Sequence, residues 1–273
     1  MSQAAKAALE SISFMEKSLA HRVKAFGLDH DESVRQWKRL VTEYNVAAMK
    51  MLQTDDYELA MDLLNRAKEL TKGDVKFGEA DDRRKLLAIT FNNMSCIHKK
   101  RGFLKTALGF AEKALKLEIA SSKADNPACT HLNLCAILSR LGRHQHALQH
   151  CQCALDLLLG ENYASGVTPG FLDEMGEEKD SSILAVCYHN MAVEFEHLQQ
   201  YDKAIQSYLK SVETAGQELG MDHAITQAFE SRANEAVPLL EAKLRESKRS
   251  KKVNEYDQKL AAYAKKTPRG TMR

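Results

Sequence analysis

Residues that interrupt regular structure are scarce in this chain, which has only 4 Pro and 13 Gly among its 273 residues. So few turn-forming residues disfavour a β-sandwich and favour long helices. No apolar run approaches the roughly 18 residues of a membrane span. The first residues lack the apolar stretch of a secretory signal. We therefore expect a cytoplasmic protein whose six cysteines are reduced thiols, not a disulfide framework.

The motifs of catalysis and cofactor binding are absent as well. The sequence contains no GxSxG, P-loop, GxGxxG or HExxH pattern, and its carboxylates are scattered. A metal site needs consideration because His146, His150 and Cys153 share one helical face. Structural zinc sites usually take ligands from two segments, whereas only one segment here is rich in them. The sequence thus predicts a protein that is not an enzyme and holds no cofactor or metal.

Three stretches of the chain repeat one pattern, in which an Asn precedes Met or Leu and then a small residue. An Ala follows each of these Asn residues fourteen positions later. The Asn–Ala pairs are Asn93 with Ala107, Asn133 with Ala147 and Asn190 with Ala204. An earlier, weaker copy includes Tyr44 and Ala60. Apolar residues recur at helical spacing within each copy, which indicates buried stripes on helices.

This pattern resembles the tetratricopeptide repeat, a helix–turn–helix unit of 34 residues. The resemblance covers roughly residues 41–214 and is best in the third copy. That copy carries the family's residue types at Tyr188, Met191, Ala192, Phe195, Tyr201, Ala204 and Tyr208. It implies an all-α, superhelical solenoid of helical hairpins with helical caps. Gly102 and Gly142 suit the turns inside two hairpins, whereas the third turn has Gln199-Gln200.

The expected domains follow from this reading. Residues 1–30 form a capping helix, and residues 31–220 form about four hairpins with an acidic loop at 160–180. A capping and basic helix at 221–266, which Pro238 should kink or break, precedes a disordered tail at 267–273. The matching segments Gly27–His30 and Gly220–His223 indicate a C-cap Gly followed by an Asp N-cap. These junctions are similar to those of the longer repeats of the kinesin light chain type.

The resemblance also implies a peptide groove lined by the first helix of each hairpin. The groove residues would be Asn45, Asn92, Asn93, Lys99, Lys100, Asn133, Arg140, His189 and Asn190. Because an Asn amide both donates and accepts, the ladder Asn93–Asn133–Asn190 could hold an extended peptide backbone. Alternatively, the same amides bond to the neighbouring hairpin. The clamp that holds chaperone C-termini is not expected, because only Asn93 matches it.

Charge is distributed unevenly along the chain. Residues 243–273 contain eleven Lys or Arg and three Asp or Glu, although the whole chain has a net charge of only +2. Such a segment attracts acidic surfaces. Its binding residues would be Lys243, Arg245, Lys248, Arg249, Lys251 and Lys252.

Two functions are compatible with this sequence. The first is an adaptor that binds a partner peptide or helix in its groove. The alternative is a structural component of a cytoskeletal or ciliary assembly, with the basic segment on an acidic polymer such as a microtubule. Nucleic acid is not an expected partner.

Overall fold

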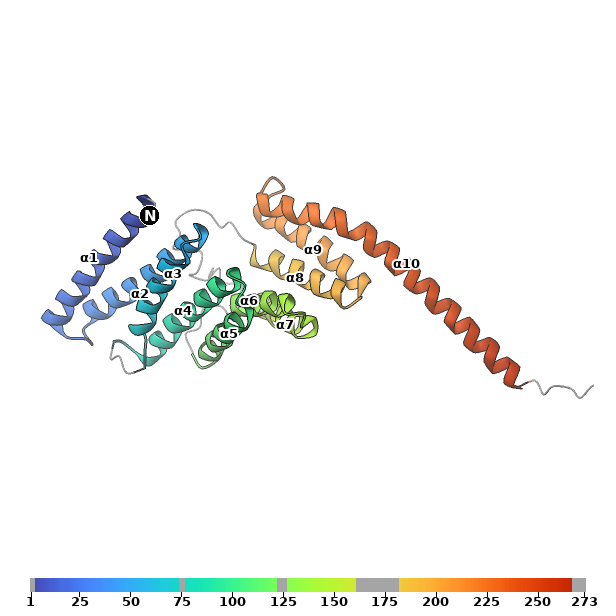
Figure 1. Ribbon diagram of the computed structural model, residues 1–273, viewed down its shortest axis with the longest axis horizontal. Coiled ribbons are helices and arrows are strands. Elements are labelled where there is room, and N and C mark those ends of the chain that lie inside the picture. Colours follow the sequence, from blue (N-terminus) through green and yellow to red (C-terminus); the bar gives the residue numbers. More distant parts are fainter. Residues whose placement is uncertain (1–2, 74–76, 122–126, 161–181, 267–273) are drawn as a thin grey trace, which may run out of the picture. The chain divides into compact units, whose positions relative to one another are not determined.

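The computed structural model describes residues 3–73, 77–121, 127–160 and 182–266. In these ranges the chain forms ten helices and no strand, which confirms the all-α prediction (Figure 1). The predicted loop at 160–180, beyond Gly160, and the tail at 267–273 lie outside the described residues. The chain divides into two compact units, Met1–Ile183 and Leu184–Arg273. This division falls inside the segment expected to form one continuous array.

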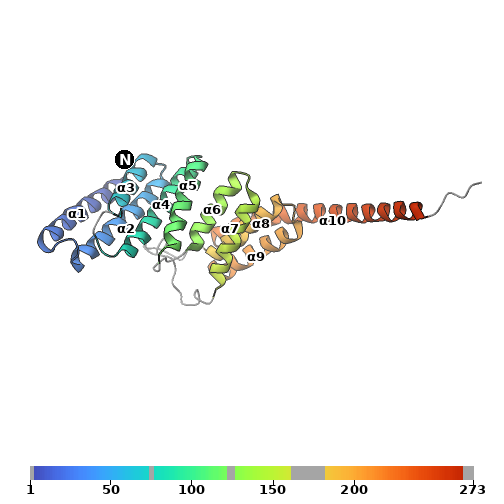
Figure 2. The same cartoon turned by 90° about the horizontal axis from the view of Figure 1, so that it is seen from below.

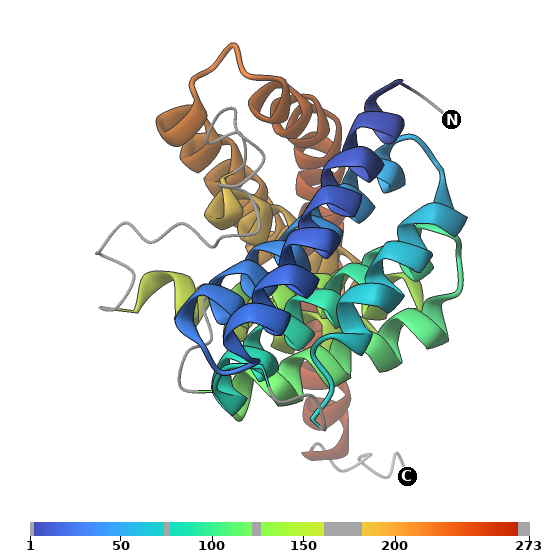
Figure 3. The ribbon, with the colours of Figure 1, turned by 90° about the vertical axis from the view of Figure 1, so that its left-hand side faces the viewer.

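Unit 1 consists of a single helix followed by three helical hairpins. The single helix is α1 (Gln3–Phe26), and the hairpins are α2 (Asp31–Gln53) with α3 (Tyr57–Glu69), α4 (Ala80–Lys100) with α5 (Leu104–Ile119), and α6 (Pro127–Arg140) with α7 (His144–Leu159). Consecutive helices lie side by side in chain order (Figure 2), and the first helices of neighbouring hairpins also touch. Helix α1 packs against α2 at the end of the unit (Figure 3).

Small residues allow the helices of each hairpin to approach closely. Ala60, Ala107 and Ala147, which recur at matched positions of the second helices, have no exposed surface. Larger side chains fill the space beside them, above all Trp37, which is also fully buried. Its Nε1 donates to the Leu70 carbonyl at 2.9 Å, so its one polar atom is satisfied.

Helix α1 buries most of the face that its sequence predicts. Ile12 and Leu19 are buried, and Met15 and Val23 pack against the same core. Phe26 continues the same apolar spacing in the sequence, which predicts that it is buried on this face, but it is 54% exposed and stacks on His30. The prediction was wrong there because α1 ends at this residue and the chain turns away.

Unit 2 contains α8 (Ile183–His197), α9 (Tyr201–Leu219) and α10 (Ala224–Lys266). Ala204 and Tyr208 of α9 are fully buried, and α10 packs along α9. Helix α10 continues through Pro238, so the predicted break does not occur (Figure 1). Pro238 and Asn234, the residue that would have accepted its N–H, are both exposed. Water can therefore bond the carbonyl that lacks a helical donor.

The turns inside the four hairpins share one backbone feature. Each contains a residue in the left-handed region, five positions before the buried Ala of the second helix. These residues are Asp55 (φ 60°), Gly102 (φ 83°), Gly142 (φ 71°) and Gln199 (φ 58°). The two glycines confirm the sequence prediction for the turns, since only glycine adopts this conformation without a steric cost. Gln199 occupies the same conformation with a side chain.

The junctions before α2 and α10 are capped by histidines. Gly27 and Gly220 have φ of 87° and 91° and end their helices, as predicted. The predicted Asp N-caps were wrong, because His30 Nδ1 accepts from the Glu32 N–H at 3.2 Å. His223 Nδ1 accepts from the Ile225 N–H at the same distance. The helices begin two residues after the aspartates, which places each His at the capping position.

Replacing Gln199 with Gly should stabilise unit 2. The left-handed conformation costs a residue with a side chain about 1–2 kcal/mol. Glycine avoids this cost, but it loses about 0.5–1 kcal/mol more conformational entropy on folding. We expect urea denaturation to show a gain of about 0.5–1 kcal/mol in the free energy of unfolding. Gln200→Gly is the control, because Gln200 has φ −89° and gains no relief. A Gln199→Gly variant no more stable than wild type would contradict the expectation.

Candidate functional site

Buried amide groups join the first helices of the first two hairpins. Asn93 Nδ2 on α4 donates to Asn45 Oδ1 on α2 at 2.9 Å. Asn45 Nδ2 in turn donates to Thr90 Oγ1 of α4 at 3.1 Å and to the Val41 carbonyl at 2.9 Å. Both Asn side chains are almost completely buried. The amides therefore hold α2 and α4 at a fixed register.

The same kind of amide–amide hydrogen bond joins the first helices of the second and third hairpins. Asn133 Nδ2 on α6 donates to Asn92 Oδ1 on α4 at 2.8 Å, and Lys99 Nζ donates to Asn133 Oδ1 at 2.6 Å. In repeat numbering, Asn92 corresponds to Asn45, and Asn133 corresponds to Asn93. We call these bonds between first helices the amide relay. The relay ends at α6, because the next acceptor position is occupied by Leu132.

These contacts are those of the alternative interpretation, in which the Asn residues bond to the neighbouring hairpin. Asn93 is 1% exposed and Asn133 is 7% exposed, and both already donate within the fold. Asn190, in unit 2, is half-buried and makes no such bond with the described residues. The predicted binding role of this ladder stays a prediction.

Three predicted groove cations lie at the C-terminal ends of the first helices. Lys100 Nζ donates to the Leu52 carbonyl of α2 at 2.8 Å and pairs with Asp55 Oδ1 at 2.7 Å. Arg140 Nη1 donates to the Lys99 carbonyl of α4 at 2.8 Å. Lys100 and Arg140 thus each donate to a carbonyl in the last turn of the first helix of the preceding hairpin. The hydrogen bond from Lys100 lowers the pKa of the Asp55 carboxyl.

The predicted groove residues are divided between the two units. Seven lie in unit 1, whereas His189 and Asn190 lie on α8 of unit 2. His189 stacks on Phe229 of α10 with ring centroids 4.5 Å apart and meets the edge of Tyr208. Burial lowers the pKa of His189. This histidine therefore packs α8 against α9 and α10.

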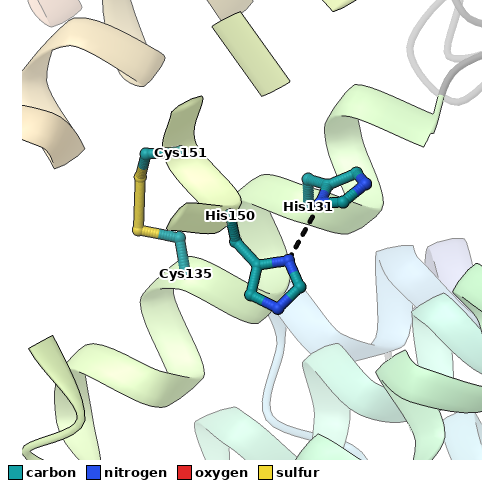
Figure 4. The surroundings of a disulfide bond; sticks show 4 residues. All are labelled: His131, Cys135, His150 and Cys151. Atoms are coloured by element: carbon teal, nitrogen blue, oxygen red, sulfur yellow. Dashed lines mark hydrogen bonds between the residues drawn. A yellow bond between two sulfur atoms is a disulfide. The ribbon is translucent and has the colours of Figure 1, made fainter. Parts of the chain in front are cut away.

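A disulfide joins Cys135 of α6 to Cys151 of α7 (Figure 4). The expectation that all six cysteines are reduced thiols was wrong for this pair. The two cysteines occupy positions held by Ser95 and Ala111 in the preceding hairpin. Small residues at these positions let the helices cross closely, and the Cα atoms of the cysteines are 6.0 Å apart.

A histidine pair lies on the same hairpin as the disulfide. The Nδ1 atoms of His131 and His150 are 2.9 Å apart, so one ring donates to the other (Figure 4). Burial lowers the pKa of His131 to about 4 and also lowers that of His150. The bond needs an unprotonated Nδ1 on the accepting ring, which the lowered pKa of both histidines favours. No group of three or more His, Cys, Asp or Glu among the described residues could hold a metal ion.

Sequence reasoning missed a cavity of about 500 Å³ between α1, α2 and α3. Tyr44 and Glu16 line it, and the Tyr44 hydroxyl donates to Glu16 Oε1 at 2.5 Å. Arg66 Nη1 pairs with the same carboxylate atom at 3.2 Å. Burial, and then Glu16, raise the pKa of Tyr44. No local sequence signal links these residues, because they come from three helices.

Unit 2 contains a similar trio, again drawn from three helices. The Tyr208 hydroxyl of α9 donates to Glu196 Oε2 of α8 at 3.0 Å, and Arg232 of α10 pairs with the same oxygen at 3.1 Å. Burial and Glu196 raise the pKa of Tyr208 to about 12. In each trio one carboxylate is contacted from two other helices, so both trios tie three helices together.

The basic segment lies on the distal part of α10. The side chains of Lys243, Arg245, Lys248, Arg249 and Lys252 are exposed, and Lys251 belongs to the same helix. Arg245 pairs with Glu241 at 3.2 Å. Surface pairs of this kind contribute little stability, so the segment keeps its basic character.

Comparison with solved structures identifies the fold. A protein from Podosopora anserina, described as a kinesin light chain with nearly identical TPR-like repeats, has a TM-score of 0.53 and 12% identity. The match covers 85% of this chain and 99% of that one. This chain has the tetratricopeptide-repeat fold. BtubC (BKLC) from P. vanneervenii is also similar, with a TM-score of 0.65 and 16% identity over 100% of this chain and 96% of that one.

Other comparisons add no narrower assignment to the tetratricopeptide-repeat fold. No protein-family model matches the chain, and no curated protein matches it. The similar structures point to no enzyme family. Within the described ranges, none of the helices has the length and apolar character that crossing a membrane requires.

Removing one amide of the relay should destabilise unit 1. Asn93→Ala leaves Asn45 Oδ1 buried without its donor, which costs about 1–3 kcal/mol. Asn190→Ala is the matched comparison and should cost less than about 0.5 kcal/mol. Urea denaturation followed by circular dichroism measures both. If Asn93→Ala left stability unchanged, the relay would not hold the helices together.

Loss of the disulfide should also be measurable. Cys135 and Cys151 are 16 residues apart, and closing a loop of that length contributes about 3 kcal/mol. We expect dithiothreitol to lower the free energy of unfolding of the wild-type chain by about that amount. The Cys151→Ala variant should be equally stable with and without the reductant. A wild-type chain that is insensitive to complete reduction would contradict the expectation.

Proposed function

We propose that the chain is a non-catalytic scaffold that binds an extended segment of a partner protein along α2, α4 and α6. The amide relay is the observation that carries this proposal, because it fixes the spacing of these three helices. A preformed surface loses little entropy on binding. Stacked repeats of this fold class use such extended surfaces for recognition.

Residues beside the relay supply a contact surface. Met49, Cys96 and Ala136 occupy the matching position of the three helices, and each is half-buried. They offer one small apolar contact per hairpin, while the relay itself takes no part. A bound segment would therefore meet an apolar row at the spacing of the repeats.

The charges beside this row favour acidic partners. Lys99, Lys100 and Arg140 lie at the ends of the same helices, and the Lys100 side chain is 43% exposed. Lys99 donates to the Asn133 side chain and Arg140 to the Lys99 carbonyl, and neutral acceptors of this kind do not cancel a positive charge, whereas Lys100 already pairs with Asp55. Charge-assisted bonds to carboxylates would fix the register of the bound segment.

Selection of phage-displayed random peptides against the full chain tests this proposal. Selected peptides should be rich in Asp and Glu, and Ala136→Trp should weaken their binding at least tenfold by blocking the surface. Gln149→Trp is the matched control, since Gln149 is exposed on α7. Circular dichroism establishes that both variants fold. Peptides bound equally well by the Ala136→Trp variant would contradict the proposed surface.

A second candidate function rests on the exposed cations of α10. Lys243, Lys248 and Lys252 lie along an exposed helix and suit an acidic polymer. In this alternative the chain is a permanent component of a cytoskeletal or ciliary assembly, for example on microtubules. It predicts salt-sensitive co-sedimentation with the polymer that is lost on deletion of residues 243–273. Co-sedimentation of the shortened chain would rule it out.

A further inference from the structure

The distal part of α10 carries an apolar stripe of its own. Val253 and Tyr256 are 54% and 65% exposed. Leu260 and Tyr263 continue the series in the sequence, so apolar residues recur at steps of three, four and three. This is the spacing of the seam of a two-stranded coiled coil. We call these four positions the distal seam.

The distal seam does not continue the face of α10 that packs in unit 2. That face contains Ala233, Ala236 and Leu240, which are buried. Leu240 and Val253 are thirteen positions apart, which at about 100° per residue places them about 140° apart around the helix. Unit 2 therefore leaves Val253 and Tyr256 of the distal seam uncovered.

Helix α10 nevertheless stays regular to Lys266. Residues 252–259 are all exposed, so no packing within the described chain supports this part of the helix. A solvated helical segment lacks the tertiary packing that supplies most of the stability of helices in proteins. A second helix that covered Val253 and Tyr256 would supply the packing that this segment lacks.

The charges beside the distal seam identify the kind of partner. With Val253 and Leu260 as the first residues of their heptads, the flanking g positions are Lys252, Lys259 and Lys266, and the flanking e positions are Asp257 and Ala264. Residues 243–266 carry nine Lys or Arg against three Asp or Glu. In a parallel pair of two copies, Lys252 of one copy would face Asp257 of the other, but the excess of basic residues on both segments would still repel. A helix with Glu beside its own seam would pair with all three lysines.

We propose that the distal seam of α10 binds an acidic amphipathic helix of a partner protein by two-stranded coiled-coil packing. The inference rests on the scaffold function and names a second contact for it, separate from the surface of α2, α4 and α6. Apolar residues of the partner would pack against Val253 and Tyr256. Acidic residues beside them would pair with the lysines, which selects against basic helices.

Two synthetic helical peptides of equal length test the proposal on the full chain. Both carry Ile and Leu at their seam positions, and one has Glu and the other Lys at every flanking position. Fluorescence anisotropy at physiological ionic strength should show the acidic peptide binding at least tenfold more tightly than the basic one. Equal binding of the two peptides, or no binding of the acidic one, would overturn the proposal.

Variants separate the seam from simple charge attraction. Val253→Ala with Tyr256→Ala should weaken binding of the acidic peptide at least tenfold. Asn254→Ala with Gln258→Ala changes exposed residues off the seam and should leave binding within twofold. Lys252→Glu with Lys259→Glu should reverse the preference toward the basic peptide. Retained binding after the seam change, or an unreversed preference after the charge change, would refute the packing.

Two further outcomes would assign the segment differently. If polyglutamate bound as tightly as the acidic peptide, the segment would be an electrostatic contact for acidic polymers. If sedimentation velocity showed a dimer that the seam variant abolished, a second copy of this chain would cover the seam. Either result overturns the proposal. The Ala136→Trp variant should still bind the acidic peptide, so failure of the groove and failure of the seam are distinguishable.

Discussion

Close approach between helices is the constraint on which both units depend. Ala60, Ala107, Ala147 and Ala204 have no exposed surface, and any larger side chain at these places would push two helices apart. Dispersion contacts across such crossings are individually weak and collectively large. The first helices of neighbouring hairpins also touch, and their polar atoms come within hydrogen-bonding distance. The alanines pack the two helices of each hairpin together, and the amide relay joins the first helices of neighbouring hairpins.

Much of the fold could be predicted because its signals are local and repeated. The spacing of Asn and Ala predicts the hairpins, and Gly102 and Gly142 predict two of the turns. The His N-caps were missed because an Asp stands beside each His and is the commoner capping residue. The continuation of α10 through Pro238 depends on which side of the helix faces water, which a propensity argument does not contain.

The candidate site was less predictable, since its contacts join residues far apart in the sequence. The positions of Asn93 and Asn133 on the first helices follow from the repeat, but their partners do not. An amide can face a groove or a neighbouring helix, and burial decides between them. The pairing of Cys135 with Cys151 likewise requires the crossing geometry of α6 and α7. The number and spacing of the cysteines in the sequence do not predict this pairing.

The disulfide also changes how the chain would respond to mechanical force. Tension applied at the two ends passes through the bond between Cys135 and Cys151 and bypasses the residues between them. An unfolded chain would therefore extend roughly 50 Å less than its residue count implies. The turn between α6 and α7 carries no tension until the bond is reduced. The distance between Cys135 and Cys151 therefore stays fixed even when the rest of the chain is stretched.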